Sequence, residues 1–80
     1  MLGLVDYAMR VLHNFEFDTE AYLIGEDSEE MYKYNMTYRT GQLSGLMCVA
    51  DGQDYSDISR IREQLTEIYD KAVRRKYDTI

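Results

Sequence analysis

Apolar and polar residues alternate along residues 31–39, MYKYNMTYR. Every even position from Tyr32 to Tyr38 is apolar or aromatic, and every odd position after Met31 is polar. A period of two is typical of a β-strand with one buried face. The competing helical face is mixed in polarity: Met31, Tyr34, Asn35, Tyr38 and Gln42. We therefore predict a strand here, at the centre of a small sheet.

Two more strands are predicted on either side of this one. Residues 16–24 begin with alternating acidic and apolar positions and end in a short apolar run. Residues 43–50, LSGLMCVA, are mostly apolar and follow Gly41, which can supply the positive φ of a hairpin turn. Residues 25–30, GEDSEE, have the composition of a turn. Sequential strands joined by short turns form an antiparallel meander.

A helix is predicted at each end of the chain. In residues 2–14, Leu2, Val5, Met9 and Leu12 recur at spacings of three and four, and Asn14 is suited to end the helix. The second helix begins at residue 58, after an N-cap at Ser56 or Asp57, and continues to the basic residues 74–76. Its apolar stripe is the most regular in the chain: Ile58, Ile61, Leu65, Ile68 and Ala72.

The predicted fold class is therefore α+β, in the order α-β-β-β-α, with a three-stranded antiparallel meander packed against two helices. Residues 1–80 form one domain, because a chain of this length has room for one core. The tyrosines of residues 31–39 should lie under the helices, and this core reading outweighs a platform for stacking nucleic-acid bases.

Charge is unevenly distributed along the chain. The formal net charge is −6, and residues 15–30 contain seven acidic residues and no basic one. A second acidic stretch, residues 50–57, contains three aspartates. Such a balance argues against nucleic acid or an anionic membrane as the main partner.

Candidate chemistry is sparse, so we expect no enzyme, no cofactor and no metal site. His13 and Cys48 are the only histidine and cysteine, and no third orienting residue accompanies them. The loop beginning at Asp51 faintly resembles a calcium loop, but its twelfth position is Arg62 instead of glutamate. The start lacks a secretory signal, no apolar run is long enough to span a bilayer, and Cys48 suits a buried position in a reducing compartment. A cytoplasmic protein is the default expectation.

The predicted order of elements resembles that of double-stranded RNA-binding domains. That family implies phosphate-gripping lysines at the start of the second helix. Here the same place reads Asp54, Tyr55, Ser56 and Asp57, which repel phosphate. RNA binding is therefore a minor alternative.

The acidic stretches are the candidate partner-binding surface. In a strand, Glu16, Asp18 and Glu20 would face one way at a spacing of about 6.6 Å. A row of carboxylates can stand in for phosphates and occupy a basic channel that normally holds DNA or RNA. Simple solubility is the alternative explanation. The candidate residues are Glu16, Asp18, Glu20, Glu26, Asp27, Glu29, Glu30, Asp51 and Asp54.

In length, acidity and predicted element order the chain loosely resembles small acidic phage inhibitors such as anti-CRISPR proteins. That resemblance implies a cytoplasmic protein that inhibits a nucleic-acid-binding enzyme by occluding its DNA or RNA site. The alternative is a self-associating structural or regulatory subunit, a homodimer, that uses Leu4, Tyr7, Val11 and exposed sheet edges. A third class, a nucleic-acid binder, would use Lys33, Arg39 and residues 74–76, against the net charge.

Overall fold

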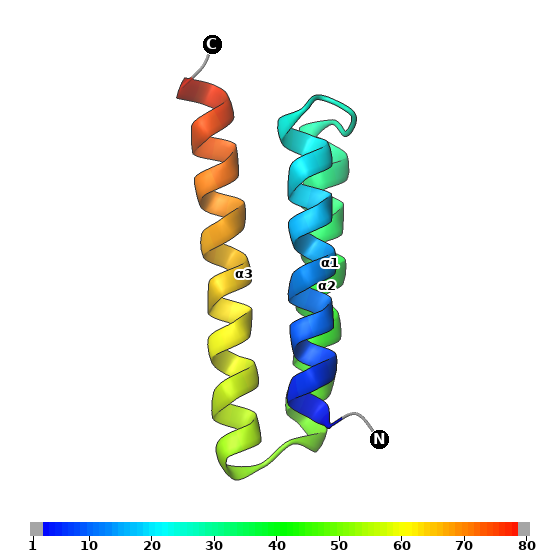
Figure 1. Cartoon of the computed structure of the whole chain (residues 1–80), viewed down its shortest axis with the longest axis vertical. Helices are drawn as coiled ribbons and strands as arrows, with labels where there is room; N and C mark the ends of the chain where they lie inside the picture. The colour runs from blue at the N-terminus through cyan, green and yellow to red at the C-terminus, as the bar shows by residue number, and fades with distance from the viewer. Residues whose placement is uncertain (1–2, 79–80) are drawn as a thin grey trace.

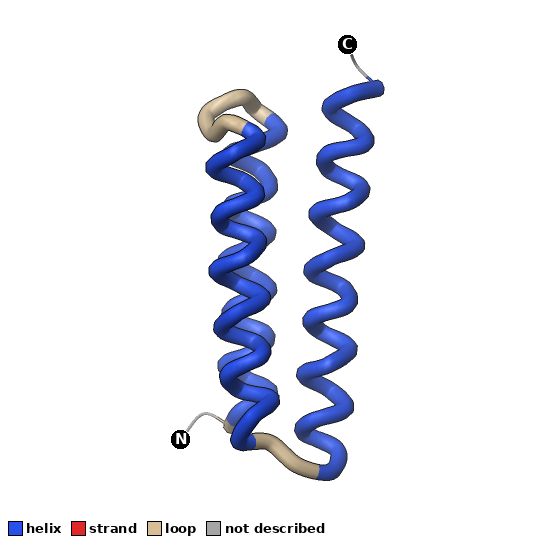
Figure 2. The backbone as a smooth tube through the Cα atoms, turned by 180° about the vertical axis from the view of Figure 1, so that it is seen from behind, coloured by secondary structure: helices blue, strands red, loops and turns tan. Residues whose placement is uncertain are grey.

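The computed structural model describes residues 3–78 as three long helices joined by two short connections. These are α1 (Leu4–Leu23), α2 (Glu29–Val49) and α3 (Gly52–Asp78). Successive helices run in opposite directions and each one packs on both others, which gives a rod measuring 44 × 20 × 16 Å (Figure 1). The α1–α2 loop lies at one end of the rod and the α2–α3 connection lies at the other (Figure 2).

The predicted α+β fold is wrong, because residues 3–78 contain no strand. All three predicted strands, residues 16–24, 31–39 and 43–50, lie within or at the ends of helices. The likeness to double-stranded RNA-binding domains rested on the order α-β-β-β-α, which residues 3–78 do not have. The likeness to phage inhibitors rested on that order together with length and acidity, so it loses its structural basis.

The tyrosine-rich segment forms helix α2, and it resembled a strand because it has two apolar faces in place of one. Tyr32, Leu43 and Met47 are buried and Met36 is partly buried, at helical spacings. Tyr34 lies on the other side of the helix and is 66% exposed. Apolar residues on both sides of a helix produce an alternation that mimics a strand. Ser28 begins the helix as its N-cap, where the side chain accepts a hydrogen bond from the Met31 amide at 3.1 Å.

Helix α1 continues nine residues beyond its predicted end. Asn14 does not stop it, because the buried face established by Ala8 and Leu12 continues at spacings of three and four. The residues that continue it are Phe15, Thr19 and Tyr22. Phe17, the other aromatic of the apparent alternation, points outward and is 64% exposed.

Helix α3 confirms the predicted apolar stripe, and the helix itself begins closer to the N-terminus than predicted. Ile58, Ile61, Leu65 and Ala72 are buried, and Ile68 packs against them. The helix begins at Gly52, six residues before the predicted start. Because Gly52 has a φ of +55° and Gly25 a φ of +90°, these two glycines, and not Gly41, turn the chain.

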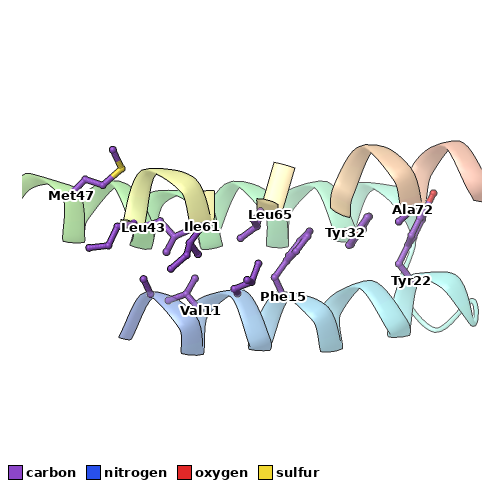
Figure 3. Close-up of a cluster of buried hydrophobic side chains, with 12 residues drawn as sticks. Val11, Phe15, Tyr22, Tyr32, Leu43, Met47, Ile61, Leu65 and Ala72 are labelled. Atoms are coloured by element: carbon purple, nitrogen blue, oxygen red, sulfur yellow. The ribbon is translucent and has the colours of Figure 1, made fainter. Parts of the chain in front are cut away.

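An aromatic stack fills the core at the level where all three helices meet. Tyr32 of α2 is fully buried, and its ring stacks on Phe15 and Tyr22 of α1 and on Tyr69 of α3. The ring centroids are 5.3, 4.4 and 5.1 Å from that of Tyr32, respectively. Figure 3 shows Phe15 and Tyr22 projecting from α1 into this layer. Aliphatic residues fill the bundle toward the α2–α3 end, so one continuous core holds the three helices together.

Candidate functional site

The carboxylates predicted as a partner-binding surface, with Asp51 and Asp54 as a second patch, are distributed over the two ends and one side of the rod. Glu26 and Asp27 lie in the α1–α2 loop, and Glu29 and Glu30 form the first turn of α2. Asp51 and Asp54 lie at the opposite end, at the start of α3. The structure therefore keeps four of the nine candidates together, and we name Glu26, Asp27, Glu29 and Glu30 the acidic end.

Asp18 does not belong to an open acidic surface. Its carboxylate Oδ2 accepts a hydrogen bond from Arg39 Nε at 3.1 Å, which joins α1 to α2. The side chains are only 18% and 22% exposed. This ion pair neutralises Asp18, so the candidate becomes a structural residue. Arg39, considered for nucleic-acid binding, is occupied by the same contact.

Glu16 and Glu20 face basic residues across a groove between α1 and α3. Arg75 and Lys76 line the groove with them, together with Leu23, Ile24 and Ile68. Glu16 also lies 3.8 Å from His13 Nδ1. The α1 carboxylates therefore contribute less to the negative field than their sequence suggests, since opposite charges lie close by.

Glu29 links the acidic end to the core. One carboxylate oxygen accepts a hydrogen bond from the Tyr22 hydroxyl at 3.4 Å, and the other accepts one from the Tyr77 hydroxyl at 3.0 Å. Burial, and then the negative charge of Glu29, raises the pKa of Tyr22. The hydrogen bond to Glu29 is the main cause of the raised pKa of Tyr77. Glu29 thus fixes the first turn of α2 against the other two helices.

Lys76 of α3 lies beside the same end of the rod. Its Nζ donates a hydrogen bond to the Tyr22 carbonyl at 2.5 Å and sits 4.4 Å from the centre of the Tyr22 ring. Asp27 and Lys76 line one shallow pocket there. The exposed carboxylates of Glu26 and Glu30 form no hydrogen bond or ion pair within residues 3–78, so they carry the open charge of the acidic end.

The predicted core role of the tyrosines holds for one of the three. Tyr32 is buried and hydrogen-bonded, and burial raises its pKa to about 12. Tyr34 and Tyr38 are 66% and 53% exposed. Tyr34 and Tyr38 were also predicted to lie under the helices, but they lie on the surface of α2.

Those two tyrosines belong to a surface that the sequence reasoning missed. Its residues recur at spacings of three and four on the side of α2 away from the core: Met31, Tyr34, Tyr38, Gly41, Gly45 and Cys48. We name them the α2 seam. All eight exposed residues of α2 from Tyr34 to Val49 are uncharged. Counting α2 as a helix with a second heptad stripe would have revealed it.

Cys48 is exposed, which contradicts the predicted buried position. His13 is also exposed, and its ring stands edge-on to Phe17 at 5.7 Å. No hydrogen bond joins it to Cys48 within the described helices, and no group of three or more potential metal ligands occurs in them. The described helices thus offer surfaces for contact with a partner.

Comparisons with protein-family models, with curated proteins and with solved structures found no match for this chain. Within residues 3–78, no helix combines the length and the apolar character needed to cross a membrane.

Proposed function

We propose that this protein is a non-catalytic binding protein whose acidic end occupies the basic nucleic-acid-binding surface of another protein and blocks it. The observation that carries the proposal is the concentration of four carboxylates in five consecutive residues, 26–30, at one end of the rod. A field of one sign draws a partner of the opposite sign and accelerates association.

The structure of the acidic end supports this proposal over a purely local role. The helix macrodipole favours acids in the first turn of α2, which accounts for Glu29 and Glu30. It does not account for Glu26, which precedes the N-cap and is exposed. Tyr22 and Tyr77 hold Glu29 by hydrogen bonds, so the α1–α2 loop ends at a fixed part of the bundle. A fixed array of charges binds with a smaller loss of entropy than a flexible one.

A capture experiment with two matched variants tests the proposal. The tagged protein is incubated with bacterial lysate, and bound proteins are eluted with increasing salt or with competing DNA. The first variant reverses three acids of the acidic end by Glu26→Lys, Asp27→Lys and Glu30→Lys. The control reverses three exposed acids on α3 by Glu63→Lys, Glu67→Lys and Asp70→Lys, and so has the same net charge.

We expect the unmodified protein to capture a nucleic-acid-binding protein, which competing DNA displaces. The first variant should no longer capture this protein, whereas the control should still capture it. Equal loss of capture by both variants would show that net charge, and not the acidic end, is responsible. Full capture by both variants would show that neither is responsible. We propose the cytoplasm as the compartment of this encounter, since an exposed single cysteine remains reduced there.

A further inference from the structure

We propose that the α2 seam is a self-association surface, on which a second copy of this chain packs its own α2 in the antiparallel direction. The inference goes beyond the proposed function and uses different residues. Two glycines lie inside α2, where glycine destabilises a helix, and no contact within the single chain requires them. A Cβ added at Gly41 or at Gly45 would meet nothing within 4 Å, so neither glycine makes room for a neighbour within the bundle.

Two large residues, Tyr34 and Tyr38, precede two small ones, Gly41 and Gly45, along the seam, and this order is complementary to itself in the antiparallel direction. In heptad terms, Met31, Tyr38 and Gly45 occupy one set of core positions, and Tyr34, Gly41 and Cys48 occupy the other. A two-fold axis midway between residues 39 and 40 pairs these sets antiparallel. It places Tyr38 of each copy over Gly41 of the other, and Tyr34 over Gly45. Every tyrosine then meets a glycine, where a ring has space.

The surroundings of Gly45 provide room for the incoming ring. A shallow groove between α1 and α2 opens beside this glycine, lined also by Tyr7, Arg10, Asn14 and Leu46. Tyr34 of the second copy would sit over Gly45 at the border of the groove. This arrangement would let the two α2 helices approach closely, since the residues at the contact set the distance between helix axes.

Charge favours this face over every other for contact between two copies. Each copy has a formal net charge of −6, so two copies repel one another in general. The exposed residues of α2 from Tyr34 to Val49 are uncharged, whereas the exposed sides of α1 and α3 carry several charged residues. Arg39 is the one charged residue in this span of α2; its side chain is 22% exposed, is paired with Asp18, and has its guanidinium carbon 5.4 Å from the centre of the Tyr38 ring. Depletion of charge and enrichment of tyrosine and methionine distinguish the centres of protein interfaces.

The available area suits a weak dimer. The seam is about 26 Å long, at 1.5 Å per residue. Covering the exposed parts of Tyr34 and Tyr38 removes roughly 240 Å² per copy, taking about 200 Å² for a tyrosine. With Met31, Val49 and the polar residues between them, the total for two copies is roughly 1,000 Å², the lower end for a specific interface. We therefore expect a dissociation constant in the micromolar range.

Sedimentation equilibrium across a concentration series provides the first test. The expected result is a monomer–dimer equilibrium that tightens as salt rises, because salt screens the repulsion between two acidic copies. Binding of the acidic end to a basic protein would weaken under the same change, so failure of either idea is visible separately. A monomer at every concentration up to the millimolar range would overturn the dimer and leave the seam to another partner.

Single substitutions then test the seam without harming the fold. Gly41→Leu adds a side chain where the single chain has open space and replaces a poor helix former. We expect a more heat-resistant monomer whose association is weakened at least tenfold. Gln64→Leu, which adds the same side chain at an exposed position of α3, is the control and should associate like the unmodified protein. Equal association of both variants would contradict the proposal.

The register is tested by exchange and by crosslinking. Tyr38→Gly and Gly41→Tyr should each weaken association, and the double variant should regain it because each ring again faces a glycine. Met31→Cys should form a disulfide with Cys48 of the second copy under oxidation. The unmodified protein should not crosslink, because its two Cys48 residues lie about 25 Å apart along the antiparallel pair. Crosslinking of the unmodified protein, or a double variant no better than either single one, would overturn the antiparallel register. Circular dichroism confirms the helical fold of each variant.

Discussion

The hydroxyl of Tyr32 lies 2.8 Å from Thr19 Oγ1, inside the bundle between α2 and α1. Thr19 donates its single hydroxyl proton to the Phe15 carbonyl at 2.9 Å, because a carbonyl can only accept. Tyr32 must therefore be the donor to Thr19. This chain of two hydrogen bonds satisfies the polar atom that the aromatic stack would otherwise bury without a partner.

Removing the Tyr32 hydroxyl and removing the Thr19 hydroxyl should destabilise the protein to different extents. Tyr32→Phe removes the donor and leaves Thr19 bonded to Phe15, so we expect a loss of about 1 kcal/mol in the free energy of unfolding. Thr19→Val leaves the Tyr32 hydroxyl buried without an acceptor, and we expect a loss of about 1–3 kcal/mol. Urea unfolding measures both. Tyr34→Phe, at an exposed ring, is the control and should change little, and equal losses at positions 19 and 32 would contradict the assigned direction.

Alkaline conditions should unfold the protein through its buried tyrosines. Burial raises the pKa of Tyr32 to about 12 from 10.0, and burial also raises the pKa of Tyr69. Between pH 10 and pH 12 Tyr32 binds more protons in the folded chain than in the unfolded one. Its contribution to the free energy of unfolding is therefore fully present below pH 10 and is lost as the pH rises toward 12. Each such group contributes a slope of at most about 1.4 kcal/mol per pH unit.

The measurement is the midpoint of urea unfolding at a series of pH values from neutral to strongly alkaline. The slope should be smaller in Tyr32→Phe than in the unmodified protein. An unchanged slope in Tyr32→Phe would show that Tyr32 does not titrate in this window.

The ion pair between Asp18 and Arg39 should stabilise the α1–α2 contact measurably. Both side chains are mostly covered, so the pair is screened less than a surface pair. A double-mutant cycle with Asp18→Asn and Arg39→Gln should give a coupling of about 1 kcal/mol. The exposed pair of His13 and Glu16, treated in the same way, should give a coupling below about 0.5 kcal/mol. Similar couplings for the two pairs would contradict the role assigned to burial.

One substitution at two glycines should change stability in opposite directions. Gly25 has a φ of +90°, which an alanine adopts only with strain, so Gly25→Ala should destabilise by about 1 kcal/mol. Gly41 lies inside α2 with open space around it, so Gly41→Ala should stabilise by roughly 0.5–1 kcal/mol in dilute solution. Thermal unfolding of both variants measures the two signs. Destabilisation by Gly41→Ala would indicate that this position does not have helical backbone geometry.

The sequence predicted a helix best where that helix has a single apolar face. α3 has one stripe, from Ile58 to Ala72, and its core was predicted correctly. α1 has one stripe that continues past Asn14, but Phe17 and the acids after it resembled a strand. α2 is apolar both toward the core at Tyr32 and toward solvent at Tyr34, so its period was ambiguous.

The candidate site was predictable in position but not in composition. Residues 26–30 connect two elements in the predicted fold, and in the observed fold they form the α1–α2 loop and the first turn of α2. Their charge is a property of the sequence. Which carboxylates remain open depends on contacts between distant residues. Asp18 meets Arg39, 21 positions away, and Glu29 meets Tyr77, 48 positions away.

The sequence by itself determined the charge, the acidic loop, the helical stripe of α3 and the absence of an evident catalytic motif. Only the tertiary structure decided that residues 31–39 are helical, because burying Tyr32 against Phe15, Tyr22 and Tyr69 requires three helices at one level. Local propensity is weak compared with such packing. The same packing turned Tyr34, Tyr38, Gly41 and Gly45 outward together, and so created a surface that linear alternation concealed.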